Sequence, residues 1–144
     1  MTKNNAIIVL GGGIGGIVAA TRLRARLPAR QRVILIDREV CHVYSPSLLW
    51  LMVGRRDVEA ITRPIAHLAQ RGIEVVRGAI EHLDPDAKTV AVNGEKYAGD
   101  YMVIALGAEY ASATVPGLAA AGCNFYTLGG ANGFSEARLR FKRG

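Results

Sequence analysis

Cysteine, histidine and aromatic residues are scarce in this chain of 144 residues, which has two cysteines, three histidines and 6% aromatic residues. Cys41 and Cys123 lie far apart and match neither a CxxC pair nor a metal-ligand spacing, so the sequence offers no disulfide framework and no zinc site. We therefore expect no metal centre and a reducing, cytoplasmic location, with both thiols acting as small apolar side chains. The three histidines form no motif, and no catalytic residue is predicted.

Long apolar runs are also missing. The run near the N-terminus is interrupted by glycines and arginines before it reaches signal-peptide form or the roughly 20 residues of a membrane span. Lysine and arginine exceed aspartate and glutamate by 18 to 12, and the net charge of +6 gathers at residues 22–32 and 138–143. With so few aromatic residues beside them, these clusters indicate solvated faces and not a nucleic-acid surface.

Glycine, by contrast, is abundant near the N-terminus, where residues 9–18 read VLGGGIGGIV. The apolar run at residues 6–10 predicts a strand that is buried on both faces of a sheet. Apolar residues at helical spacing predict a helix over 14–27, which ends before Pro28. Residues 32–37, RVILID, predict a second buried strand parallel to the first. The order is therefore strand, glycine turn, helix, strand.

This order and its spacing are typical of a dinucleotide site. Gly11, Gly13 and Gly16 satisfy GxGxxG, in which the glycines permit a tight turn, a close pyrophosphate and close helix packing. Asp37 lies about 20 residues beyond the last glycine, where an acid can bind both hydroxyls of an adenosine ribose. The alternative is a structural turn beside a surface aspartate. The residues expected to contact the dinucleotide here are Gly11, Gly13, Ile14, Gly15, Gly16, Asp37 and Arg38.

The rest of the chain departs from simple alternation of strands and helices. Period-two alternation over residues 80–98, with turns at DPD and NG, predicts a three-stranded antiparallel meander. The other expected elements are short helices at 48–53, 61–70 and 134–141 and strands at 73–76 and 101–107. The predicted fold is α/β: a Rossmann-like parallel sheet with helices and an inserted antiparallel meander.

With this meander the chain resembles the FAD domain of the pyridine nucleotide-disulfide oxidoreductase superfamily. In that superfamily the strand after the meander ends in Ala-Thr-Gly near the flavin, and Ala105-Leu106-Gly107 matches with leucine in place of threonine. The resemblance also implies that the backbone at Ala79 and Ile80 forms the adenine pocket. FAD is therefore the implied cofactor, with Ala105 and Gly107 near it.

A second stretch, YSPSLLWLMVGRRDVEAITRPIAHL, is similar to a pattern of sulfide:quinone oxidoreductases and flavocytochrome c sulfide dehydrogenases. Type II NADH:quinone oxidoreductases share a looser version of the same loop pattern. The matching residues are Tyr44, Pro46, Ser47, Trp50, Gly54, Arg56, Ile61, Pro64 and Ile65, while Leu49 replaces a second proline. The resemblance implies that Pro46 and Ser47 border the ribityl and pyrophosphate of FAD and that Arg56 lies near it. The alternative is a packed loop around a buried Trp50.

The chain also departs from this family pattern. Tyr126 stands where an additional cysteine commonly precedes a threonine, and Cys123 does not fit, so neither cysteine is predicted to be a redox residue. A second glycine fingerprint and a returning Gly-Asp motif are missing. We therefore expect residues 1–144 to form a single, incomplete FAD-binding domain without a second dinucleotide domain, and to be inactive alone.

The expected function is that of the FAD-binding N-terminal portion of a sulfide:quinone-oxidoreductase-like flavoprotein. In a complete enzyme, two electrons would pass from sulfide, or NADH, to FAD and then to quinone. The alternatives are a module that binds ADP or an adenine dinucleotide without redox turnover, a portion of a type II NADH:quinone oxidoreductase, and a fragment that binds nothing. Homodimerisation through the surface left by the missing half is a further expectation, and attachment of a full-length relative to the cytoplasmic membrane stays open.

Overall fold

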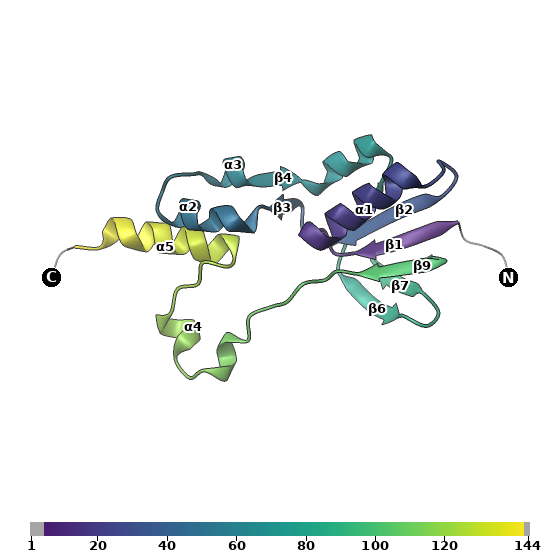
Figure 1. Cartoon of the computed structure of the whole chain (residues 1–144). Helices are drawn as coiled ribbons and strands as arrows, with labels where there is room; N and C mark the ends of the chain where they lie inside the picture. The colour runs from purple at the N-terminus through teal and green to yellow at the C-terminus, as the bar shows by residue number, and fades with distance from the viewer. Residues whose placement is uncertain (1–4, 143–144) are drawn as a thin grey trace. The chain divides into compact units, whose positions relative to one another are not determined.

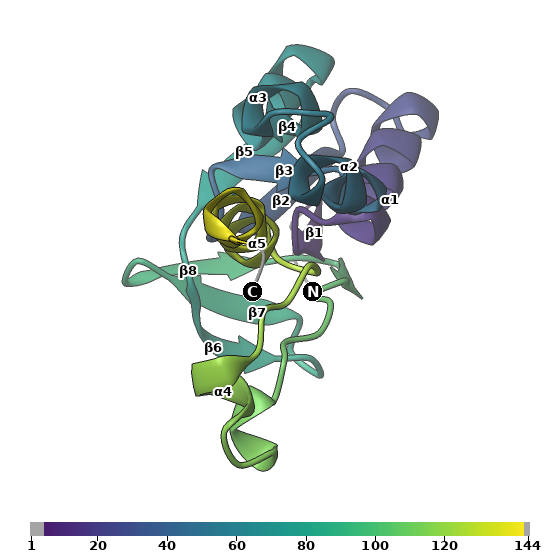
Figure 2. The same ribbon diagram turned by 90° about the vertical axis from the view of Figure 1, so that its left-hand side faces the viewer.

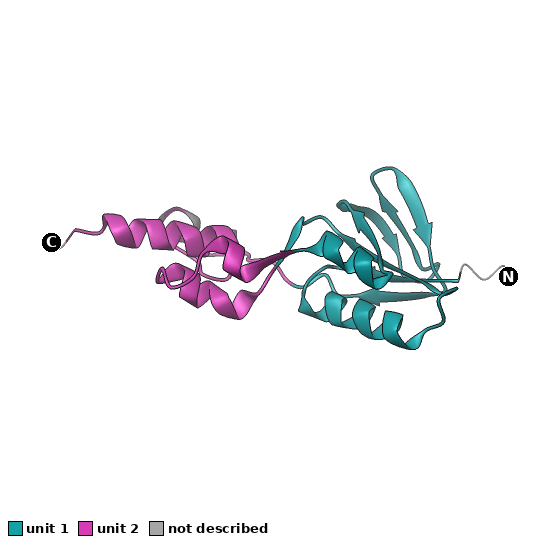
Figure 3. Cartoon of the chain, turned by 90° about the horizontal axis from the view of Figure 1, so that it is seen from above, with its two compact units in different colours: residues 1–42, 64–107 teal, residues 43–63, 108–144 magenta. Residues whose placement is uncertain are grey.

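The computed structural model describes residues 5–142, and the chain divides into two compact units (Figure 3). Unit 1 contains Met1–His42 and Pro64–Gly107, and unit 2 contains Val43–Arg63 and Ala108–Gly144. Arg143, at the end of the second basic cluster, lies outside the described residues. Each unit is built around its own apolar cluster or clusters.

A four-stranded parallel sheet forms the centre of unit 1 (Figure 1). Its strands are β1 (Ala6–Leu10), β2 (Arg32–Asp37), β5 (Glu74–Arg77) and β9 (Tyr101–Ile104), in the order β5-β2-β1-β9. The five residues of β1 are all buried, as expected for a central strand covered on both faces. At the carboxyl edge, Leu10 of β1 lies between Ile36 of β2 and Ile104 of β9.

Two helices cover one face of this sheet. They are α1 (Ile14–Arg26) and the 3₁₀ helix η2 (Ile65–Arg71). Alternate strand residues, Val9, Val33 and Leu35, pack with Ala20 and Ile65 in one buried cluster. Burial of this apolar face is the main force that holds the helices to the sheet.

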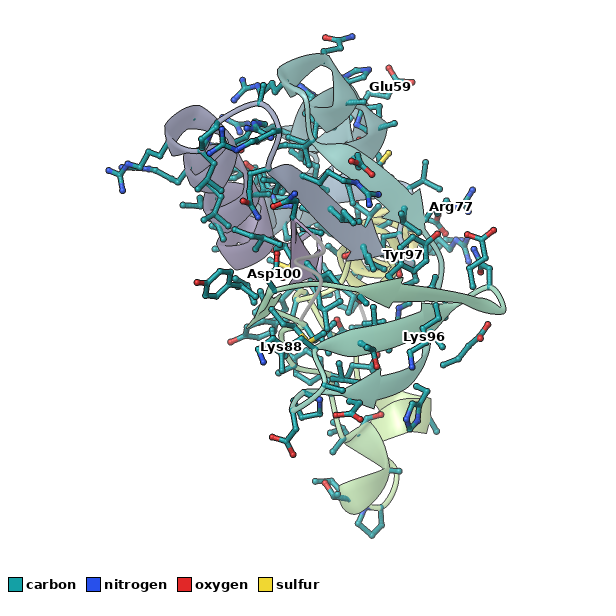
Figure 4. All side chains as sticks on the ribbon, turned by 90° about the vertical axis from the view of Figure 1, so that its right-hand side faces the viewer. Glu59, Arg77, Lys88, Lys96, Tyr97 and Asp100 are labelled. Atoms are coloured by element: carbon teal, nitrogen blue, oxygen red, sulfur yellow. The ribbon has the colours of Figure 1, made fainter. Side chains whose placement is uncertain are left out.

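The predicted meander covers the other face. It consists of β6 (Ile80–Asp84), β7 (Thr89–Val92) and β8 (Glu95–Ala98), paired antiparallel in that order. Val90 and Val92 are buried with the side chains of β1 and β2 that point away from the helices. On β8, Tyr97 packs against this cluster whereas Lys96 is exposed (Figure 4). The α/β fold with an inserted meander is therefore confirmed.

Unit 2 is helical and centres on the packing of α2 (Leu48–Met52) with α5 (Leu128–Arg140) (Figure 2). Leu48, Leu51, Ile61 and Ala131 form its buried cluster. Its short elements are η1 (Ser45–Ser47), α3 (Val58–Ile61), η3 (Ser112–Thr114) and α4 (Leu118–Ala121). The chain passes from unit 1 to unit 2 and back within a two-stranded sheet of β3 (Cys41–Val43) and β4 (Thr62–Pro64).

Three predicted elements differ from the structure. The helix predicted at 61–70 is wrong at residues 62–64, because Thr62–Pro64 forms β4 and the 3₁₀ helix η2 begins only after Pro64, which lacks an amide N–H. The tail helix begins at Leu128 and not at 134, since the Thr127 hydroxyl accepts a hydrogen bond from the Gly130 N–H at 3.0 Å. The strand predicted at 101–107 ends at Ile104.

An ion pair joins β2 to its outer neighbour β5. The Arg32 guanidinium donates from Nε and Nη2 to the two carboxylate oxygens of Glu74, at 2.8 and 2.7 Å. This hydrogen bonding lowers the pKa of the Glu74 carboxyl below its ordinary value. Both side chains are about half exposed, so solvent screens their attraction.

We predict that Glu74→Gln lowers the free energy of unfolding by less than about 1 kcal/mol at pH 7. Because the folded-state pKa lies below the unfolded one, this stabilisation is present above the unfolded pKa and disappears as the pH falls through the folded pKa. A double-mutant cycle measures the interaction free energy between Arg32 and Glu74. It compares urea denaturation of the wild type, Glu74→Gln, Arg32→Gln and the double variant. An equally large coupling in acid would contradict the assignment.

Candidate functional site

The glycine turn closes tightly between β1, α1 and the end of β9. The Gly11 N–H donates to the Ile36 carbonyl at 2.8 Å, and its φ of +101° is a conformation that few other residues adopt. A Cβ atom at Gly11 would overlap the Ala105 carbonyl oxygen, and one at Gly16 would overlap the Gly11 carbonyl oxygen. These two glycines are therefore required by close backbone packing, as the sequence motif predicts.

Two other glycines of the turn, Gly13 and Gly15, are not confined by close packing. Gly13 and Gly15 are exposed, and a Cβ on Gly13 would meet no atom within 4 Å. Gly13 is the N-cap residue of α1 and offers no side-chain cap; the Ile17 N–H makes its helical bond to the Gly13 carbonyl at 3.0 Å. Amide groups at this helix end, together with the positive end of the helix dipole, favour an anion.

Asp37 lies at the end of β2 with its carboxylate turned toward the glycine turn. Its Oδ2 accepts a hydrogen bond from the Gly12 N–H, and its Oδ1 accepts one from the Glu39 N–H at 2.6 Å. The structure thus brings together the two parts of the predicted motif. Arg38 is exposed and pairs with the Glu39 carboxylate at 3.3 Å, and its contact with a dinucleotide stays a prediction.

The start of the meander and the end of β9 reach the same edge of the sheet. The Gly78 N–H donates to the Asp37 carbonyl at 2.9 Å, which places exposed Ala79 next to the end of β2. The side chain of Ile80 packs against the core cluster, and the role of the Ala79 and Ile80 backbone in an adenine pocket stays a prediction. The Ala105 N–H donates to the Leu10 carbonyl at 2.8 Å, so the end of β9 lies beside the glycine turn. Gly107 follows, exposed, with a φ of +75°.

The other predicted contact residues belong to unit 2. The buried Ser47 hydroxyl accepts a hydrogen bond from Arg56 Nη1 at 2.7 Å, while Pro46 is exposed. Trp50 is also exposed, with the Arg55 guanidinium 5.4 Å from its ring centroid, so the alternative of a buried tryptophan is wrong. Whether Pro46, Ser47 and Arg56 border a cofactor stays a prediction.

Cysteine and histidine residues add one contact that the sequence did not predict. His42, in β3, places Nδ1 3.1 Å from the Gly12 carbonyl oxygen. No motif connects these two residues, because their proximity depends on the path of β3.

The two cysteines form no disulfide. Cys41 is half-buried and Cys123 is exposed; both are free. Within residues 5–142, no three His, Cys, Asp or Glu side chains gather as metal ligands would. Nor does any described helix have the length and apolarity needed to cross a bilayer.

A family model and several known proteins match this chain. The model of the family described as pyridine nucleotide-disulphide oxidoreductase matches residues 5–143. The sulfide-quinone reductase of Aquifex aeolicus is 38% identical over 103 residues, which are 70% of this chain and 24% of that protein. The alternative NAD(P)H-ubiquinone oxidoreductase C1 of Arabidopsis thaliana is 30% identical over 159 residues, covering 98% of this chain and 31% of that protein.

The fold is also that of a solved relative. The structure of the sulfide:quinone oxidoreductase from Aquifex aeolicus superposes with a TM-score of 0.87 and 30% identity, covering 96% of this chain and 32% of that chain. The chain therefore spans about a quarter to a third of the length of these relatives. The family resemblance predicted from the sequence is confirmed.

We predict that Gly16→Ala destabilises the protein by about 2 kcal/mol or more, because its Cβ would overlap the Gly11 carbonyl oxygen. Gly15→Ala is the matched control in the same helix, since its Cβ would lie 3.8 Å from that of Ala105, an ordinary contact. Alanine favours a helix over glycine, so this variant should be as stable as the wild type or slightly more stable. Denaturation midpoints in urea compare the two; equal stability of both variants would contradict the packing argument.

Proposed function

The chain belongs to the pyridine nucleotide-disulphide oxidoreductase family, and from this premise we propose that it binds the ADP half of FAD at the carboxyl edge of the parallel sheet. The observation that carries the proposal is the fixed position of the Asp37 carboxylate. The amides of Gly12 and Glu39 hold it beside the uncapped N-terminus of α1. Residues 1–144 are proposed to be one FAD-binding portion of a flavoprotein.

Three features of this edge fit the three parts of ADP. The open backbone at Gly13 and Gly15 fits the pyrophosphate, because it joins exposed amides to the helix dipole. The Asp37 carboxylate fits the ribose hydroxyls, since each of its oxygens keeps a lone pair beyond the amide that it binds. Ala79, exposed beside the end of β2, fits the adenine.

The flavin half of the cofactor supplies the two-electron acceptor that the reaction needs. The residues of this chain are proposed to bind and orient the cofactor. Ala105 and Gly107 lie at the end of β9, next to the glycine turn, and are proposed to face the flavin side of the cofactor. Ser47 and Arg56 are proposed to act as one hydrogen-bonded pair, in which the guanidinium fixes the hydroxyl.

The proposed electron donor of the whole protein is sulfide and the acceptor is a quinone. Support comes from the 38% identity to the Aquifex aeolicus sulfide-quinone reductase. NADH is the second candidate donor, because the similarity to the Arabidopsis thaliana NAD(P)H-ubiquinone oxidoreductase extends over 98% of the chain. Both assignments are drawn from whole proteins, of which this chain matches 24% and 31%.

We expect the purified chain to bind FAD more tightly than ADP or NAD, because both of these carry the ADP group but lack the flavin contacts. Isothermal titration with the three ligands, together with an absorbance spectrum of protein purified without added cofactor, measures this. Equal affinity for FAD and ADP would favour a module that holds only the adenosine half. No binding of any ligand would refute the proposed site. Anaerobic addition of sulfide or NADH to the FAD-loaded chain, beside a free-FAD control, then follows bleaching of the flavin. Bleaching faster than in the control would identify the donor and contradict the expectation that the chain is inactive alone.

We predict that Asp37→Asn weakens ADP binding by about 2 kcal/mol, because charge-assisted hydrogen bonds to the ribose are lost. The asparagine Oδ1 can still accept the Gly12 N–H, whereas its Nδ2 would face the Glu39 N–H and lose that bond, so circular dichroism checks that the variant is folded. Glu39→Gln is the matched control. Glu39 is exposed and lies two residues after Asp37, so this substitution also removes one negative charge nearby. Calorimetric titration with ADP should show full affinity for Glu39→Gln. Unchanged affinity of Asp37→Asn would place the ribose elsewhere.

A further inference from the structure

Gly12, the middle glycine of the turn, is held at both of its backbone polar groups. Its N–H donates to Asp37 Oδ2, and its carbonyl oxygen lies 3.1 Å from His42 Nδ1. Gly12 is itself buried, and a Cβ on it would press on Ile65 and Asp37. The peptide groups on both sides of Gly12 are therefore fixed by side chains that come from β2 and β3.

The bond to His42 has a consequence for the next residue. The Gly12 carbonyl and the Gly13 N–H belong to one planar trans peptide group, in which the two bonds point in opposite directions. Fixing the carbonyl toward His42 therefore fixes the Gly13 N–H toward the other side. Gly13 is exposed there, with open space around it, at the N-terminus of α1.

The chemistry of this contact defines the state of the imidazole. A carbonyl oxygen only accepts hydrogen bonds, so Nδ1 must carry the hydrogen. The half-buried imidazole belongs to β3. The residue before this strand, Val40, is held in place because its carbonyl accepts a hydrogen bond from the Ile65 N–H at 3.0 Å. A donor on a paired strand is more rigid than one on a free loop.

We propose that His42 is a positioning residue for the pyrophosphate: its Nδ1–H holds the Gly12 carbonyl and thereby aims the Gly13 N–H at the phosphate. This inference rests on the proposed function, because it requires a phosphate-bearing ligand at the glycine turn. His42 does not touch the ligand. The contrasting possibility is that His42 serves only to stabilise the fold, in which case it would not distinguish phosphate-bearing from phosphate-free ligands.

The test compares His42→Phe, which keeps a ring but removes the donor, with His42→Asn, whose Nδ2–H lies near the position of Nδ1–H. Calorimetry with ADP and NMR titration with adenosine measure affinity with and without phosphates. We expect His42→Phe to lose about fivefold in ADP affinity, the size of one hydrogen bond, with adenosine affinity unchanged. His42→Asn should retain ADP affinity. Circular dichroism of each variant checks that it is folded.

Each outcome decides a different point. A wild-type chain that does not bind ADP would overturn the proposed function and this inference with it. If the wild type binds ADP but His42→Phe binds equally well, or loses ADP and adenosine affinity alike, only the inference is overturned. An Asn variant as weak as the Phe variant would also overturn it. If His42→Phe does not fold, ¹⁵N NMR of the wild-type imidazole decides: hydrogen on Nε2 and not on Nδ1 would refute the donor role.

Discussion

The close approach of the glycine turn to α1 and to the end of β9 is the constraint on which the site depends. At Gly11 and Gly16 a side chain would overlap a backbone carbonyl, so β1 can pass into α1 with almost no intervening chain. The amide end of the helix consequently reaches the same edge of the sheet as Asp37. A wider turn would separate the two, and one ligand could not use both the helix N-terminus and the carboxylate.

Burial of the strands keeps this edge in place. Val9, Val33 and Leu35 pack under the helices, whereas Ile8 and Ile36 pack under the meander, so both faces of the central strands lie in apolar clusters. A one-residue slip of such a strand would exchange the side chains between the two clusters and disrupt the packing of both. Their carboxyl ends, and the polar groups that follow them, are therefore positioned by the core.

The sequence predicted the layered unit well because its signals are local. The apolar runs of β1 and β2, the glycine spacing and the period-two meander each depend on neighbours in the chain. Unit 2 was predicted less well, since α5 begins at a threonine cap followed by two glycines, a weak helical pattern that is stabilised by packing of Ala131 against α2. Thr62–Pro64 likewise forms a strand only because β3 is there to pair with it.

The same distinction applies to the site. Asp37 could be found from its distance to the glycines, whereas His42 could not, because its contact with Gly12 depends on the course of β3 and leaves no spacing rule in the sequence. The groups that fit a pyrophosphate are backbone amides, which every residue type possesses. Side chains can then act indirectly, because they hold the peptide groups that carry these amides in a fixed orientation. The Gly12 peptides show this arrangement: Asp37 fixes the one before it and His42 the one after it. The proposed role of His42 follows from this arrangement: a side chain that holds a backbone carbonyl can orient an amide without contacting the ligand itself.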